Sequence, residues 1–135
     1  MTTRASGTFD VKLLPLPTAF TGDDAPLARM SIDKQFRGDL EATSKGEMLS
    51  AGSPKTGSAG YVAIEKVIGT LHGREGSFTL QHSATMNRGV PSLSVTVIPD
   101  SGTGALTGIS GSLNIIIANK QHSYELDYTL GGAHG

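Results

Sequence analysis

The chain of 135 residues contains no cysteine and no tryptophan. Without cysteine there is no disulfide, no zinc site built on thiolates and no cysteine nucleophile. Long hydrophobic runs are also missing, because no apolar stretch approaches the roughly 20 residues of a membrane-spanning helix. The opening residues 1–7 lack the apolar segment of a secretory signal. We therefore expect a soluble, cytoplasmic protein that does not associate with membranes.

An excess of positive charge is absent too. The chain has 11 Lys and Arg residues against 12 Asp and Glu residues, for a formal net charge of -1. These charges are scattered along the chain, and no basic cluster forms. Proteins that bind nucleic acid normally carry a basic stripe, so we predict no nucleic-acid partner.

Glycine, by contrast, is abundant, with 18 residues. The glycines fall between short segments of alternating polarity, which is typical of strands joined by tight turns. We predict strands at residues 7–14, 28–36, 39–49, 61–71, 77–86, 93–98, 108–118 and 122–130. A helical turn within residues 41–48 is the alternative for the third segment, although Gly46 weakens a helix.

No window shows a convincing helical period, so the fold class is all-β, with one domain over residues 1–135. Short links between consecutive strands favour antiparallel neighbours. Eight such strands can form a closed antiparallel barrel, which removes the exposed edges of an open sheet. A two-sheet sandwich is the competing architecture.

The segment 77–86 defines which side chains face the inside of the barrel. Phe78, Leu80 and His82 share one face with Ala84 and Met86, while the other face is uniformly polar. A turn centred on residues 74–75 would pair 71 with 78, 67 with 82 and 65 with 84. Facing partners lie on the same side of a sheet. Glu65 is therefore predicted to point into the barrel, diagonally across from His82.

The last two segments allow the same reasoning. A turn at residues 120–121 would pair 117 with 124, 115 with 126 and 113 with 128. The opposite face would bury two unpaired carboxylates, which is costly. The predicted inward set is therefore Leu113, Ile115, Ile117, Tyr124, Leu126, Tyr128 and Leu130, with His122 near the rim.

This alternation leaves Val62, Ile64 and Ile68 on the outside. An exposed apolar stripe normally marks a contact surface. We predict a homo-oligomer contact through these residues. The alternative is a slipped register, which would bury Lys66 and expose Glu65.

Three segments, residues 69–82, 99–113 and 122–130, resemble a bacterial family of domains of unknown function, DUF3224. The resemblance covers nearly the whole chain. It implies a barrel similar to that of allene oxide cyclase, an eight-stranded relative of the calycins. The glycine spacing at residues 102, 104, 108 and 111 is similar to a turn-plus-strand signature of that superfamily. The resemblance implies no settled activity, and a fold alone does not assign chemistry.

Two motifs have simpler explanations than the functional ones they suggest. The glycine-rich stretch 102–111 lacks the Gly-Lys-Ser/Thr ending of a phosphate-binding loop, so a tight turn and close strand packing explain it better. Glu65, His82 and His122 together supply the two histidines and one carboxylate of a known type of metal site. Mutual hydrogen bonding inside the barrel is the simpler explanation. We predict no metal and no cofactor.

The candidate site combines the polar side chains predicted to lie inside. Glu65, His82 and Tyr124 are the candidate catalytic residues, and burial is expected to raise the Glu65 pKa towards neutrality. Three functions stay open: a module that binds a small, largely apolar ligand, a cofactor-free isomerase or cyclase, and an oligomeric scaffold with a filled core. The candidate ligand-binding residues are Tyr61, Phe78, His122 and Tyr128.

Overall fold

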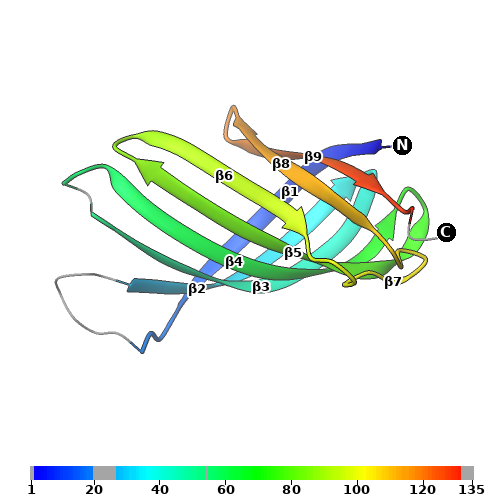
Figure 1. The fold of residues 1–135 in the computed structure, drawn as a ribbon, viewed down its shortest axis with the longest axis horizontal. Helices are drawn as coiled ribbons and strands as arrows, with labels where there is room; N and C mark the ends of the chain where they lie inside the picture. The colour runs from blue at the N-terminus through cyan, green and yellow to red at the C-terminus, as the bar shows by residue number, and fades with distance from the viewer. Residues whose placement is uncertain (1, 20–26, 54, 132–135) are drawn as a thin grey trace.

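A computed structural model describes residues 2–19, 27–53 and 55–131. All of its regular secondary structure is β, and one antiparallel sheet of nine strands closes through β4 and β5 into a barrel (Figure 1). The predicted eight-stranded closed barrel is confirmed, with β7 as one short additional strand. The strands are β1 (Thr3–Leu16), β2 (Leu27–Gly38), β3 (Leu40–Ser53), β4 (Ser58–Leu71), β5 (Arg74–Asn87), β6 (Val90–Val97), β7 (Thr103–Gly104), β8 (Ser110–Ala118) and β9 (Gln121–Thr129).

Three hairpins turn on two residues with positive φ. These pairs are His72 and Gly73 (48° and 78°), Arg88 and Gly89 (48° and 85°), and Asn119 and Lys120 (53° and 64°). Two-residue turns of this mirror-image type match the twist of the flanking strands. The residues 41–48, for which a helical turn was the alternative, are extended within β3.

The turn positions correct two predicted registers. Val67 pairs with Phe78 and Glu65 with Leu80, so the predicted partners on β5 were wrong by four residues. On the β8–β9 hairpin, Ile117 pairs with His122, two residues from the predicted partner. Both shifts are even, and side chains alternate with a period of two along a strand. The inward faces are therefore as predicted, although the partners differ.

One half of the barrel interior is filled. The loop between β6 and β8, which contains β7, lies across this end, near the start of β1 and the end of β9 (Figure 1). Its Leu106 and Ile109 are 1% and 2% exposed. A Cβ on Gly102 would come within 2.1 Å of the Leu106 carbonyl oxygen, so the glycine serves close packing, as predicted. The other buried residues of the hydrophobic core are Ala5, Phe9, Phe36, Leu40, Ala42, Val67, Leu71, Phe78, Leu80, Val95, Val97, Leu113, Tyr124, Leu126 and Tyr128.

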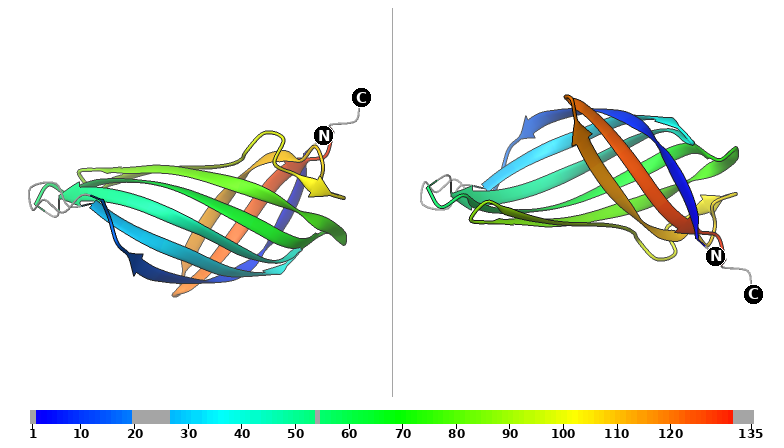
Figure 2. Two further views of the ribbon diagram at one scale, coloured as in Figure 1. Left: turned by 90° about the horizontal axis from the view of Figure 1, so that it is seen from below. Right: turned by 90° about the horizontal axis from the view of Figure 1, so that it is seen from above.

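The other half of the barrel is open. The single pairing between β6 and β8 in the described residues is that of Thr96 with Ser112. Beyond it the two strands diverge (Figure 2). Ile117 faces this half but is 67% exposed, so its predicted burial was wrong.

The outward stripe on β4 is present. Val62, Ile64 and Ile68 are 54%, 55% and 57% exposed, whereas Glu65 is fully buried. Lys66 lies on the outside, which excludes the slipped register. The homo-oligomer contact through this stripe stays a prediction. Within the described part of the chain, no helix has the length and apolar character that crossing a membrane requires.

Candidate functional site

A charged cluster crosses the interior where the filled half meets the open half. Lys34 of β2, Ser44 of β3, Glu65 of β4 and His82 of β5 supply it, and all four are buried. Lys34 lies directly opposite Ser44 on the neighbouring strand. Because facing residues share a side of the sheet, four consecutive strands direct these polar side chains to one place.

The Glu65 carboxylate is the centre of the cluster. Its Oε1 accepts a hydrogen bond from Lys34 Nζ at 2.8 Å and lies 2.6 Å from His82 Nε2. Its Oε2 accepts a bond from the Ser44 hydroxyl at 2.5 Å. The predicted neighbours Glu65 and His82 are therefore in direct contact. Both carboxylate oxygens are satisfied although the group is shut off from water.

The predicted direction of the Glu65 pKa is corrected by these contacts. Burial on its own would raise the pKa. The hydrogen bond to His82, the charge of Lys34 and the bonds to Lys34 and Ser44 outweigh it and lower the pKa from 4.5 to about 2. Glu65 is consequently an anion at neutral pH and a weak proton acceptor. A raised pKa would have required a carboxyl group without a cation beside it.

Lys34 is the functional candidate that the sequence analysis missed. Its ammonium group lies 4.9 Å from the centre of the Phe9 ring and 5.7 Å from that of Phe36, as well as on Glu65. Aromatic faces attract cations, most strongly where water is excluded. The signal was available, because Ile32, Lys34 and Phe36 alternate with polar residues along β2.

Gly46 makes room for the glutamate. It lies directly opposite Glu65 on β3. A Cβ at this position would come within 2.1 Å of the Ile64 carbonyl oxygen and 2.8 Å of the Glu65 Cβ. A side chain at residue 46 would therefore push β3 and β4 apart beside the buried carboxylate.

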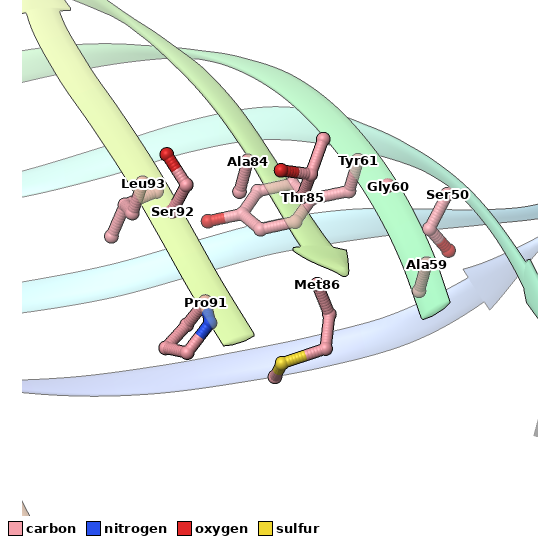
Figure 3. A pocket seen from close by; sticks show the side chains of 10 residues that line it. All are labelled: Ser50, Ala59, Gly60, Tyr61, Ala84, Thr85, Met86, Pro91, Ser92 and Leu93. Atoms are coloured by element: carbon pink, nitrogen blue, oxygen red, sulfur yellow. The ribbon is translucent and has the colours of Figure 1, made fainter. Parts of the chain in front are cut away.

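A cavity of about 230 Å³ lies directly beside the charged cluster, with Lys34 and His82 among its lining residues. A second hollow of about 330 Å³ shares Tyr61 and Leu93 with it and opens towards the ends of β4, β5 and β6. Figure 3 shows the Tyr61 ring reaching from β4 across β5 towards β6. The remaining lining residues of the inner cavity are mostly apolar: Phe9, Val11, Leu13, Ile32, Met48, Ala63, Ile115, Ile117 and His122.

Four of the predicted site residues gather around the open half. Glu65 and His82 form the buried pair, and Tyr61 and His122 line the cavity. Burial and the nearby charge of Glu65 raise the Tyr61 pKa, which keeps this phenol neutral. The ring of His122 packs 5.2 Å from that of Phe9. In the described residues, no three His, Asp or Glu side chains are arranged to hold a metal ion.

The other three predicted residues lie in the filled half. Phe78 is part of the packed core. The Tyr124 hydroxyl accepts a bond from the Leu40 amide at 2.9 Å and donates to the Arg37 carbonyl at 3.0 Å, so it holds the β2–β3 turn. The Tyr128 hydroxyl is hydrogen-bonded to His72 Nδ1 at the filled end of the barrel. The structure therefore does not bring them to the Glu65–His82 pair.

Comparison with known proteins agrees with the fold. A family model described as a protein of unknown function (DUF3224) matches residues 5–128. A crystal structure of a DUF3224-family protein of unknown function from Shewanella oneidensis MR-1 is 50% identical, with a TM-score of 0.94 over 98% of this chain and 100% of that one. No curated protein matches. The matched residues span nearly the entire barrel, and the chain belongs to the DUF3224 family.

Proposed function

We propose that the open half of the barrel binds a small, largely apolar molecule. The observation that carries this proposal is the cavity of about 230 Å³ that has mainly apolar walls and a buried polar cluster at its inner end. Ligand sites are typically concave and apolar with a few convergent polar groups. The adjoining hollow beside Tyr61 gives an elongated molecule room to continue towards the solvent.

The scaffold hypothesis fits this interior less well. A barrel of eight strands can be packed solid or can enclose one small ligand. Here the packed core occupies the filled half of the barrel. The open half is hollow and lined by partly exposed apolar side chains. Filling the hollow half with a ligand would remove that apolar surface from water.

The contact between Glu65 and His82 favours a second candidate function, a cofactor-free isomerase or cyclase. A carboxylate that accepts a bond from one ring nitrogen orients a histidine as a proton acceptor at the other. His82 lines the cavity, whereas Glu65 is fully buried. His82 is therefore the better candidate for proton transfer. Turnover of an epoxide or enone panel that is lost in His82→Leu, with ligand binding retained, would favour the enzyme.

A matched pair of variants tests the binding proposal. Leu13 lines the cavity, whereas its neighbour Leu14 on the same strand points to the outside of the barrel. The two side chains are similarly exposed, at 42% and 47%. The neutral fluorescent probe N-phenyl-1-naphthylamine is titrated into the wild-type protein, Leu13→Arg and Leu14→Arg. We expect Leu13→Arg to weaken binding at least roughly tenfold, because an arginine places a charge in an apolar site.

The control variant Leu14→Arg is expected to bind as the wild type does. No fluorescence increase with the wild-type protein, or equal losses in both variants, would overturn the proposal. Native mass spectrometry of protein purified from its own host supplies a second measurement. A co-purifying small molecule that is absent from Leu13→Arg would support the proposal and give the class of the natural ligand.

A further inference from the structure

We propose that the binding site is selective for a ligand end that carries a hydrogen-bond acceptor and a donor on one carbon, as a carboxylic acid or a carboxamide does. The acceptor would meet Lys34 Nζ, and the donor would meet His82 Nδ1. An acid that is ionised in water would enter together with one proton. This inference rests on the proposed function, and it names the class of ligand that the same cavity takes.

Lys34 supplies the donor side of this arrangement. An ammonium group has three N–H donors and no acceptor. One of them bonds to Glu65, and across the described residues the structure gives Nζ no second hydrogen-bond acceptor. Aromatic rings of Phe9 and Phe36 flank it, and Lys34 contributes to the cavity lining. A ligand oxygen at this end of the cavity would satisfy a buried donor.

His82 supplies the acceptor side. Glu65 is ionised and can only accept hydrogen bonds, so His82 Nε2 must carry the proton between them. In the neutral imidazole, Nδ1 then keeps its lone pair. The structure gives Nδ1 no hydrogen-bond partner in the residues it describes, although the ring lines the cavity and the residue is only 3% exposed. A ligand O–H or N–H would satisfy it.

Charge balance sets the condition on acids. The positive charge of Lys34 and the negative charge of Glu65 cancel within the buried cluster. Ser44 on β3, Tyr61 on β4 and His122 on β9 are the other polar groups around the cluster and cavity, and none is a fixed cation. A bound carboxylate would leave one uncompensated buried charge, which is strongly unfavourable. One proton taken up together with the acid removes that cost.

A series of eight-carbon ligands tests the head group on the wild-type protein. Octanamide has both the acceptor and the donor, methyl octanoate has only acceptors, and octanoate becomes equivalent to the amide only after it takes up a proton. Each displaces N-phenyl-1-naphthylamine in a competition titration. We expect octanamide to bind roughly tenfold more tightly than methyl octanoate, which is the usual effect of one buried hydrogen bond.

The same series is repeated at two pH values. Because one proton is taken up with each acid, the apparent affinity for octanoate should fall roughly tenfold per pH unit between about pH 7.5 and about pH 8.5. The affinity for octanamide should stay constant. In His82→Leu, the preference for octanamide over methyl octanoate should disappear while the probe still binds. If this variant does not fold, the wild-type series decides the question alone.

The outcomes separate this inference from the proposed function. Equal affinities for octanamide and methyl octanoate, or octanoate binding that does not change with pH, would overturn the head-group inference while the probe result leaves the binding site in place. If neither the probe nor any member of the series binds, both the proposed function and this inference are wrong.

Discussion

The buried carboxylate of Glu65 ties the stability of the barrel to pH. In the folded protein its pKa is about 2, compared with an ordinary value of 4.5. This difference corresponds to about 3 kcal/mol, at about 1.4 kcal/mol per pH unit. Because the folded-state pKa is depressed, the stabilisation is complete above the unfolded-state pKa. It is lost as the pH falls from about 4.5 through about 2.

Urea unfolding followed by circular dichroism at several pH values measures this effect. Between about pH 6 and about pH 2, the free energy of unfolding of the wild-type protein should fall by about 3 kcal/mol more than that of Glu65→Gln. The control is Glu47→Gln, which removes an exposed ion pair with Arg29. Exposed pairs contribute about 0–1 kcal/mol, so this variant should retain the acid sensitivity of the wild type.

Parallel pH profiles for the wild type and Glu65→Gln would refute the reasoning. A second perturbation covers the case in which Glu65→Gln is too unstable to measure. Removing the cation alone, in Lys34→Met, should cost about 3–5 kcal/mol at neutral pH, because it leaves a buried charge without its partner. The double variant Lys34→Met/Glu65→Gln should lose less than the two single variants together. Additive losses would contradict a coupled pair.

Three further predictions concern the remaining features. Tyr124→Phe should lower the free energy of unfolding by about 1–3 kcal/mol, since it leaves backbone groups of the β2–β3 turn unpaired, and should leave probe binding unchanged in the titration. Gly46→Ala should lower the melting temperature strongly, because a Cβ would come within 2.1 Å of a carbonyl oxygen; Gly60→Ala, with its nearest neighbour at 3.6 Å, should not. If the outward stripe is a homo-oligomer contact, Ile64→Lys should reduce the mass measured by light scattering to that of a monomer. The control Ile116→Lys changes an isoleucine that is exposed elsewhere and should leave the mass unchanged. Equal masses for the wild type and Ile64→Lys would refute the contact.

The inward position of Glu65 beside His82 follows from alternation along one hairpin. Period-two alternation survives an even error in register, so the faces were predicted correctly although the turn was placed two residues too late. The turn itself carried a signal, because Gly73 readily adopts the positive φ that a two-residue hairpin requires. Partner identity depends on that turn, whereas the face does not.

The electrostatics of the site were less predictable. The direction of the Glu65 pKa depends on Lys34, which lies on a strand that is far from Glu65 in sequence. Applying the same alternation to β2 places Lys34 inside with Phe36, and would have reversed the expected shift. Nothing comparable in the sequence indicates that one half of the barrel is open. This opening depends on how β6 meets β8 across the intervening loop, which is a property of the closed barrel rather than of either strand.

The divergence of β6 from β8 leaves the wall of the barrel weakly joined on one side. In the described residues past Thr96 and Ser112, the facing edges of these two strands share no further backbone pairing, so separating them there breaks no ladder hydrogen bond. A ligand of the proposed site would therefore have a lateral route to the polar cluster, between these two strands, as well as the route through the open end. Amide protons on the facing edges of β6 and β8 should exchange with solvent faster than those of the other strands. A ligand bound in the open half of the barrel should slow this exchange.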